Sequence, residues 1–360
     1  MRAIKFLGLI CYFSLFIFFG CTTLNISATN NNNNAFKFES VIKKTRKSVV
    51  LLSTNPNIDP TTDPKQNALC SGVVVNGGVL TNFHCVYKQN HIKLYYYDKN
   101  DWKQYDVDVI GEDPLADLAL LKVIGKEESI PYLKFADNVE EIEEGTEVFA
   151  LGHPMGMVWT VTKGIISSNE RYARHPYIKA LQTDASINKG NSGGPLLNMK
   201  GEIIGINALI ISRISENAGI ALAIRGDVVK SSYESMLDDG KVDRPAVGVM
   251  IKSLASVKNR KKFLEEFPKQ DPNYIPNTYG LLIHKDENIP KGLKAFDTII
   301  GVNDVLINDG LQFSDELRKY KIGDIITLTI IRKQVFLRVD VPLKVFPVPV
   351  ETMYGKRPNG

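Results

Sequence analysis

DASINKGNSGGPL, residues Asp184–Leu196, places three glycines close to Ser192. A serine hydroxyl becomes a nucleophile when a base takes its proton and nearby donors stabilise the oxyanion that forms. Glycines allow the tight turn that points consecutive amide hydrogens at one position. The stretch therefore predicts Ser192 as a nucleophile, with an oxyanion hole made by the backbone of Gly190, Asn191 and Ser192. An ordinary surface turn is the alternative, because Gly, Asn and Ser are common in turns.

A nucleophilic serine needs an imidazole base, and the chain contains five histidines. His84 lies in the stretch VLTNFHCV (residues 79–86), where an apolar strand ends and a short helical turn begins. A residue at such a junction is held by a sheet and reaches into a cleft. We predict His84 as the base, and a structural histidine is the alternative.

The imidazole needs a carboxylate that fixes its tautomer. Asp117 stands directly before an apolar run that is typical of a buried strand, where a carboxylate requires a hydrogen-bond partner such as a histidine N–H. Asp113 precedes a proline and is predicted to be a turn residue. The chain order is then His84, Asp117, Ser192. This is the chymotrypsin-like order, and it differs from the orders of subtilisin and the α/β-hydrolases.

Three segments together resemble the HtrA (high-temperature-requirement) family of trypsin-like serine proteases: TNFH at 81–84, DPLADLAL at 113–120 and TDASINKGNSGG at 183–194. The resemblance implies His84 as general base and acid, Asp117 as its orienting carboxylate and Ser192 as nucleophile. It also implies an oxyanion hole at the backbone of Gly190 and Ser192. It implies no metal and no organic cofactor.

Short apolar segments separated by turn signals recur from about residue 48 to residue 224, which favours an all-β barrel or sandwich. The resemblance narrows this to a mainly β fold with a chymotrypsin-like double β-barrel over residues 36–240 and the active site in the cleft between the barrels. In relatives, the segment that corresponds to Asn207, Ala208 and Leu209 lines the primary specificity pocket. Its aliphatic character predicts a small or branched apolar residue before the scissile bond, and a plain strand end is the alternative.

The resemblance also suggests a disulfide between Cys70 and Cys85, because chymotrypsin-like enzymes carry one beside the catalytic histidine. A hairpin turn at residues 76–78 lies midway between the two cysteines, so strand pairing would bring them together. Such a bond requires an oxidising compartment. Two buried, reduced thiols are the alternative.

Residues 1–21 combine a short basic start with an apolar stretch too short for an ordinary membrane span. The stretch ends at Cys21 and resembles a bacterial lipobox, with Phe18 where leucine is usual. We predict a lipoprotein-type signal peptide, lipidation of Cys21 and a flexible Asn-rich tether over 22–35. A simple cleaved signal peptide and an uncleaved anchor are the alternatives. All three place the protein outside the cytoplasm.

A second domain is predicted over residues 245–346, followed by a tail at 347–360. The stretch AVGVMI (246–251) resembles the carboxylate-binding loop of a PDZ domain, with Val247, Gly248 and Val249 as candidates. KGLKAFDTI (291–299) resembles a later PDZ motif, with Phe296 in place of a glycine. We expect a PDZ-like α+β domain that binds C-terminal peptides by strand addition. A PDZ-like scaffold that binds no peptide is the alternative.

These features together predict a serine endopeptidase on the periplasmic side of a bacterial cell envelope, lipid-anchored to a membrane, which cleaves unfolded or damaged proteins. Relatives form homotrimers through an N-terminal aromatic segment, for which Phe36 and Phe38 are candidates. A net charge of +4 without a basic stripe argues against nucleic-acid binding. The alternatives are a catalytically silent peptide-binding holdase and a regulated site protease with one signalling substrate.

Overall fold

The structure, a computed structural model, describes residues 29–53, 70–125, 130–154, 159–173, 175–208, 220–254, 257–266, 276, 278–284 and 289–355. Contacts divide the chain into two compact units, Met1–Glu39 and Ser40–Gly360. The predicted signal peptide, the lipidation candidate Cys21 and the pocket candidate Leu209 lie outside the described residues. None of the helices in the described ranges has both the length and the apolar character needed to cross a membrane.

The first described element is helix α1, Thr29–Thr45, followed by the 3₁₀ turn η1, Arg46–Ser48. Its last turn is closed by the Thr45 hydroxyl, which donates to Val41 O at 2.9 Å. The helix includes residues 29–35, where the sequence predicted a flexible tether. Once a helix is nucleated, each further residue is added at low cost, so even a run of asparagines can extend it.

Six antiparallel strands close the first β-barrel in the order β1-β2-β3-β6-β5-β4. The strands are β1 Val49–Ser53, β2 Cys70–Val75, β3 Gly78–Thr81, β4 Lys93–Asp98, β5 Asp101–Asp113 and β6 Leu118–Val123. The short strands β1, β2 and β6 are buried almost throughout, which explains their nearly continuous apolar sequences. Helix α2, Phe83–Val86, follows β3 and carries His84.

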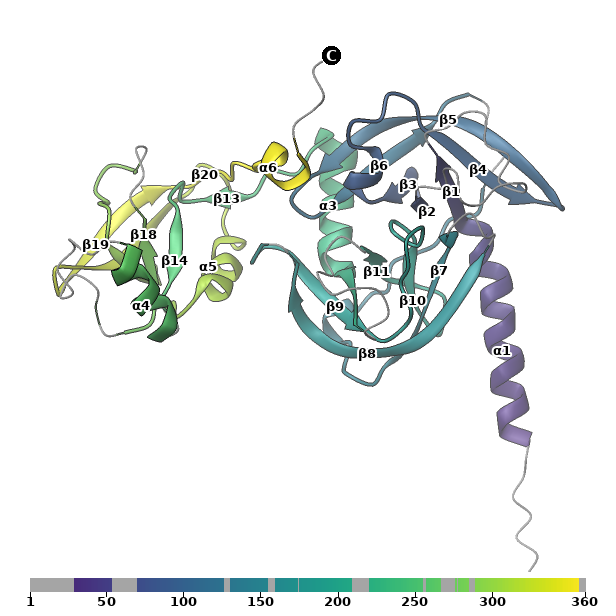
Figure 1. Cartoon of the computed structure of the whole chain (residues 1–360), viewed down its shortest axis with the longest axis horizontal. Coiled ribbons are helices and arrows are strands. Elements are labelled where there is room, and N and C mark those ends of the chain that lie inside the picture. Colours follow the sequence, from purple (N-terminus) through teal and green to yellow (C-terminus); the bar gives the residue numbers. More distant parts are fainter. Residues whose placement is uncertain are drawn as a thin grey trace, which may run out of the picture. The chain divides into compact units, whose positions relative to one another are not determined.

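Six further strands close the second barrel in the order β10-β11-β12-β9-β8-β7. The strands are β7 Glu147–Gly152, β8 Thr160–Tyr172, β9 Lys179–Thr183, β10 Pro195–Asn198, β11 Ile203–Asn207 and β12 Ala221–Arg225. A 3₁₀ turn, η2 Val139–Glu141, precedes β7. Figure 1 labels the strands of the first barrel and those of the second except β12. The predicted chymotrypsin-like double barrel is therefore confirmed.

Helix α3, Gly226–Asp239, follows the second barrel and packs against β5 and β6 of the first barrel and β11 and β12 of the second. Gly111 on β5 permits this approach, because a Cβ there would overlap the Met236 side chain. The helix ends at Gly240, whose φ of 70° places it in the left-handed region that glycine adopts easily.

The C-terminal α+β region contains a six-stranded sheet in the order β14-β15-β16-β18-β19, with β17 paired to β16. Its elements are β14 Ile251–Ser253, α4 Val257–Glu266, β15 Leu281–Ile283, β16 Thr298–Val302, β17 Val305–Leu306, α5 Gly310–Leu317, β18 Ile325–Arg332 and β19 Val335–Pro342. A separate pair, β13 Pro245–Ala246 and β20 Lys344–Val345, joins the two ends of this region. The last helix is α6, Val350–Tyr354. The α+β architecture expected after the barrels is confirmed.

Candidate active site

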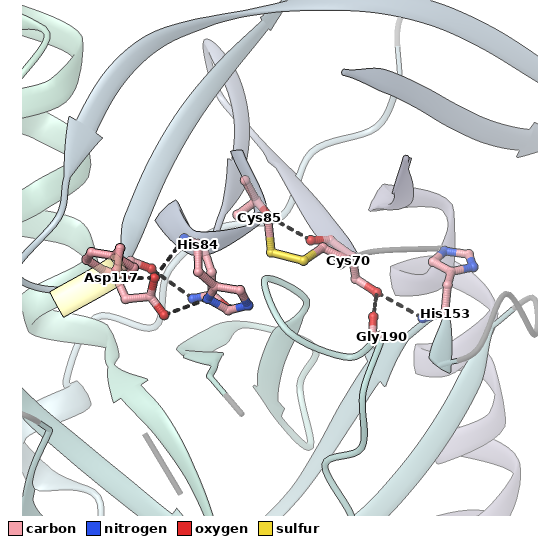
Figure 2. The surroundings of a disulfide bond; sticks show 10 residues. Cys70, His84, Cys85, Asp117, His153 and Gly190 are labelled. Atoms are coloured by element: carbon pink, nitrogen blue, oxygen red, sulfur yellow. Dashed lines mark hydrogen bonds and ion pairs between the residues drawn. A yellow bond between two sulfur atoms is a disulfide. The ribbon is translucent and has the colours of Figure 1, made fainter. Parts of the chain in front are cut away.

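His84 and Asp117 form a hydrogen-bonded pair, with His84 Nδ1 2.8 Å from Asp117 Oδ2 (Figure 2). The Asp117 side chain is 1% exposed and that of His84 is 18% exposed. An ionised carboxylate only accepts hydrogen bonds, so Nδ1 carries the proton and Nε2 is the basic nitrogen. The His84 backbone N–H also donates to Asp117 Oδ1 at 2.9 Å. The carboxylate thus fixes both the tautomer and the place of the imidazole.

Asp117 lies at the end of the β5–β6 connection, which we call the aspartate loop, Asp113–Leu118. Its φ of 58° is in the left-handed region, which aspartate tolerates better than most residues. In this conformation, its carbonyl accepts from Asn82 Nδ2 at 2.9 Å and from the Phe83 N–H at 3.0 Å. Side chain and backbone of Asp117 are therefore both bound to the segment that begins helix α2.

Ser192 lies between β9 and β10 of the second barrel and is 3% exposed. Its carbonyl accepts from the Ser71 N–H on β2 at 2.8 Å. The next residue, Gly193, has a φ of 82°, and a Cβ there would overlap Ser71 O and Thr81 Oγ1. The glycine after the serine is thus required for close contact with the first barrel. This contact brings the serine segment against β2 and the end of β3, from which the chain continues to His84.

The backbone before Ser192 is held by a second link to the first barrel. The Ser71 hydroxyl donates to Gly190 O at 2.7 Å and accepts from the His153 N–H at 2.9 Å (Figure 2). Gly190 has a φ of 105°, a conformation that favours glycine. The Asn191 N–H donates to Asn188 O at 2.9 Å and closes a turn. In this conformation that hydrogen is used within the turn, and the assignment of Asn191 to the oxyanion hole stays a prediction.

A disulfide joins Cys70 at the start of β2 to Cys85 in α2, with a Cα–Cα distance of 6.1 Å (Figure 2). Strands β2 and β3 pair through a tight hairpin, which brings the two cysteines together. Cys85 directly follows His84, so the bond ties the histidine segment to the strand that contacts the serine segment. Two cysteines and His84 make the one group of potential metal ligands in the described ranges. Disulfide sulfurs cannot act as thiolate ligands, and this group does not fit a metal site.

The predicted specificity-pocket residues lie at the end of β11. Asn207 and Ala208 are both fully buried. Asn207 Nδ2 donates to Pro195 O at 3.2 Å, and its backbone carbonyl accepts from the Gly193 N–H at 2.9 Å. Asn207 therefore supports the segment that follows Ser192. The assignment of residues 207–209 to a substrate pocket stays a prediction, because residues 209–219 lie outside the described ranges.

The predicted carboxylate-loop residues of the C-terminal domain, Val247, Gly248 and Val249, line a pocket of about 500 Å³. One side of this pocket is formed by residues Phe313, Ser314 and Leu317 of α5. Gly248 has a φ of 79°, which turns the chain sharply before β14. The same pocket is also lined by His175 and Tyr177 of the second barrel and by Phe346. The assignment of residues 247–249 to a carboxylate-binding loop stays a prediction.

Asp113 was predicted to be a turn residue, and in the structure it also forms a buried ion pair. Its Oδ1 accepts from the Ala116 N–H, as expected in a turn. In addition, Arg244 pairs with both carboxylate oxygens, at 2.8 and 2.6 Å, and Ser232 Oγ donates to Oδ2 at 2.7 Å. The Asp113 side chain is 1% exposed. A buried ion pair therefore connects the aspartate loop to the segment that leads into the C-terminal domain.

His153 is a buried histidine outside the His84–Asp117 pair. Its Nδ1 accepts from the backbone N–H of Trp159 at 3.4 Å, so the ring proton lies on Nε2. Burial lowers the pKa of His153 from 6.5 to about 4, because the charged ring would lose its hydration. His175 is a second such case, and burial, Arg244 and Arg318 lower its pKa to about 4.

We expect the stability of the protein to fall as the pH decreases from 6.5 to 4. In this window the unfolded chain binds a proton on His153 and the folded protein does not, so protonation favours unfolding. The contribution is fully present above pH 6.5 and amounts to about 3 kcal/mol. Thermal unfolding midpoints at pH 7 and 4.5 should therefore separate less in His153→Gln than in the wild type. The exposed His91 supplies the control, and His91→Gln should follow the wild type. Equal pH dependence in all three proteins would contradict the assignment.

Comparison with known proteins agrees with this arrangement. The profile of the trypsin-like peptidase domain matches residues 70–206, a range that contains His84, Asp117 and Ser192. The fold and the site thus define a protein of the trypsin-like serine peptidase class. A probable periplasmic serine endoprotease DegP-like of Pseudomonas putida (strain GB-1) is 34% identical over 286 residues, which are 78% of this chain and 57% of that protein. The relative of the same description from Rickettsia prowazekii (strain Madrid E) is 34% identical, over 78% of this chain and 54% of its own.

A solved structure of the HtrA-type protease AlgW with a decapeptide superposes with a TM-score of 0.71 at 25% identity, covering 87% of this chain and 99% of that one. The chain belongs to the HtrA/DegP-like family of trypsin-fold serine proteases. It spans somewhat less than three fifths of the length of the DegP-like relatives described above.

Proposed function

We propose that the protein is an extracytoplasmic serine endopeptidase in which Ser192, His84 and Asp117 form the catalytic triad. The observation that carries the proposal is the 2.8 Å hydrogen bond between His84 Nδ1 and the buried carboxylate of Asp117. This bond leaves Nε2 as the base. The serine segment is held against the same barrel by Ser71 and Gly193, which supports a serine hydroxyl close to that base.

In the proposed reaction, Ser192 Oγ attacks the scissile carbonyl carbon and His84 Nε2 takes the hydroxyl proton. The backbone amides of Gly190 and Ser192 stabilise the oxyanion. The C–N bond then breaks, and His84 gives its proton to the leaving amine. Water, deprotonated by His84, hydrolyses the acyl-enzyme. Asp117 stays ionised throughout and stabilises the imidazolium.

Polypeptides are the proposed substrates, with unfolded or damaged envelope proteins as the class. AlgW, similar in fold, has been solved with a decapeptide and with a tripeptide, which supports peptide binding here. The pocket beside Val247, Gly248 and Val249 is the proposed site for C-terminal peptides. The division into a protease domain at 36–240 and a PDZ-like domain at 245–346 belongs to this proposal, as does assembly into a homotrimer.

The proposed location is the periplasmic side of a bacterial envelope. The DegP-like relatives are named periplasmic endoproteases. The Cys70–Cys85 disulfide also requires an oxidising compartment. A lipid anchor at Cys21 remains the proposal for membrane attachment.

Labelling with a fluorophosphonate, which reacts with activated serines, tests the proposed activity. We expect the full chain to be labelled and Ser192→Ala to remain unlabelled. Ser186, an exposed serine in the same segment, supplies the matched control, because Ser186→Ala should be labelled like the wild type. A wild-type protein that resists labelling, with and without added C-terminal peptides, would refute the enzyme and support a peptide-binding holdase.

A further inference from the structure

The chain after the C-terminal domain returns to the first barrel, although the sequence predicted only a tail there. Val350 and Tyr354 of α6 pack against the apolar core of that barrel. The Tyr354 ring lies 5.0 Å from that of Phe83 and 5.6 Å from that of Tyr87, measured between centroids. The Tyr87 hydroxyl donates to Gly355 O at 3.3 Å. Helix α6 is therefore fixed against the residues on either side of His84 in α2.

The Tyr354 hydroxyl reaches the aspartate loop itself. Tyr354 Oη lies 2.7 Å from Pro114 O and 3.3 Å from Asp117 Oδ1. Both acceptors belong to the loop, one near its beginning and one near its end. In Figure 2 the pale yellow ribbon of the C-terminal segment lies beside Asp117. A single hydroxyl thus contacts the loop at two points, one of which is the carboxylate that binds His84.

Oδ1 is the carboxylate oxygen that does not accept from the imidazole. It accepts from the His84 backbone N–H at 2.9 Å, and the Tyr354 hydroxyl is its second polar neighbour. The hydroxyl has one hydrogen, which it shares between Pro114 O at 2.7 Å and Oδ1 at 3.3 Å, so its bond to Oδ1 is the weaker branch. Together with the His84 backbone N–H, this branch restricts rotation of the carboxylate about its Cβ–Cγ bond. Oδ2 is thereby kept in line with His84 Nδ1. Without the Tyr354 hydroxyl, the Asp117 carboxylate would have one hydrogen-bond partner fewer to maintain this orientation.

Asp113, the first residue of the aspartate loop, is bound by a residue that lies just before the C-terminal domain. Arg244, just before β13, pairs with Asp113. The Arg244 carbonyl accepts from the Phe346 N–H at 2.7 Å, directly after β20. Strands β13 and β20 pair with each other. The segments that enter and leave the C-terminal domain are therefore joined, and each sends one polar side chain to the aspartate loop.

We propose that Tyr354 is a positioning residue for the His84–Asp117 pair, and that the C-terminal segment Val350–Tyr354 thereby completes the active site. The proposal rests on the proposed peptidase function. Tyr354 does not touch the substrate, and it acts through the orientation of Asp117. Packing alone is the competing account. The two accounts make different predictions for removal of the Tyr354 hydroxyl group, because packing requires only the aromatic ring.

Tyr354→Phe in the full chain separates these accounts, since it keeps the ring and removes the hydroxyl. We expect kcat, and the rate at which a fluorophosphonate labels Ser192, to fall about fivefold with an unchanged KM, as for the loss of one hydrogen bond worth about 1 kcal/mol. The low-field proton resonance of the His84–Asp117 hydrogen bond, identified by its absence in His84→Ala, should shift. Tyr132, which is 51% exposed, supplies the control, and Tyr132→Phe should change neither readout.

Two outcomes would overturn the proposal. One is a labelling rate of Tyr354→Phe equal to that of the wild type, well below both melting temperatures. The other is a lower rate with an unmoved resonance, which would indicate a loss of packing or stability only. Failure of the proposed function would look different, because the wild type itself would then not be labelled at Ser192. The wild type and Ser192→Ala are therefore measured first.

Discussion

Replacing Asp117 with asparagine is expected to lower kcat by about four orders of magnitude, with little change in KM. An amide can present its NH₂ group to His84 Nδ1, and the imidazole then carries its proton on Nε2. That nitrogen can no longer accept the Ser192 proton. Asp117 is fully buried and is therefore shielded from a bound peptide, so substrate binding should be preserved. Steady-state hydrolysis of casein-derived peptides by Asp117→Asn and by the wild type measures the effect.

A matched control for this experiment is Asp106→Asn. Asp106 is 60% exposed and pairs with Lys93 on the barrel surface, so its loss should leave kcat within a factor of about two. Wild-type activity in Asp117→Asn would show that the His84–Asp117 hydrogen bond has no catalytic part. A large rise of KM at constant kcat would assign Asp117 to substrate binding instead.

Replacing Arg244 with methionine is expected to destabilise the folded protein by about 3–5 kcal/mol, because a buried carboxylate is left without its counter-charge. Arg244 alone supplies two of the hydrogen bonds to Asp113, whose side chain is 1% exposed. The unfolding midpoint should decrease on the order of 10 °C. Differential scanning calorimetry at neutral pH measures the shift.

The pair Arg338–Asp304 is the control, because its side chains are 61% and 92% exposed and its N–O distance is 3.5 Å. Arg338→Met should cost less than about 1 kcal/mol. The double variant Asp113→Leu/Arg244→Met removes both charges and should recover part of the lost stability. A single variant Arg244→Met as stable as Arg338→Met would disprove the interpretation of a buried, mutually dependent pair.

The sequence predicted the residues of the site where local patterns carry the information. His84, Asp117 and Ser192 each lie in a short segment that combines a strand end with a reactive side chain. The glycines around the serine were also predicted to serve a tight turn. Gly193 adopts a positive φ at the contact between the two barrels. The apolar spacing of residues 227–237 and the glycine that follows them also predict a helix that ends near Gly240, and α3 ends there.

Contacts between distant parts of the chain could not be predicted. Arg244 lies 131 residues from Asp113, and Tyr354 lies 237 residues from Asp117. Neither side chain belongs to a local motif, and an arginine in a linker or a tyrosine in a tail usually faces solvent. The burial of Asp113, which implies a partner, is seen only in the structure, because the sequence predicted a turn residue at that position. The sequence alone could not say which cation that partner was.

Element boundaries were predicted less well than element types. The sequence predicts a helix from Ser314 to Tyr320, whereas helix α5 begins four residues earlier, at Gly310. The difference arises from Asp309, whose carboxylate accepts from the N–H groups of Leu311 and Gln312 and caps the helix one turn earlier. The charged insertion after β14 contains helix α4, in which Phe263 is buried against Leu282. Phe263 and the neighbouring Leu264 thus attach a mostly charged helix to the sheet.

The disulfide gives the enzyme a chemical requirement for maturation. The bond closes a loop with a sequence separation of 15 and should add about 3 kcal/mol of stability, chiefly by restricting the unfolded chain. Before oxidation, Cys85 and the adjacent His84 lack this restraint. We therefore expect the segment around His84 to unfold more easily in a chain whose cysteines are still reduced than in the oxidised protein.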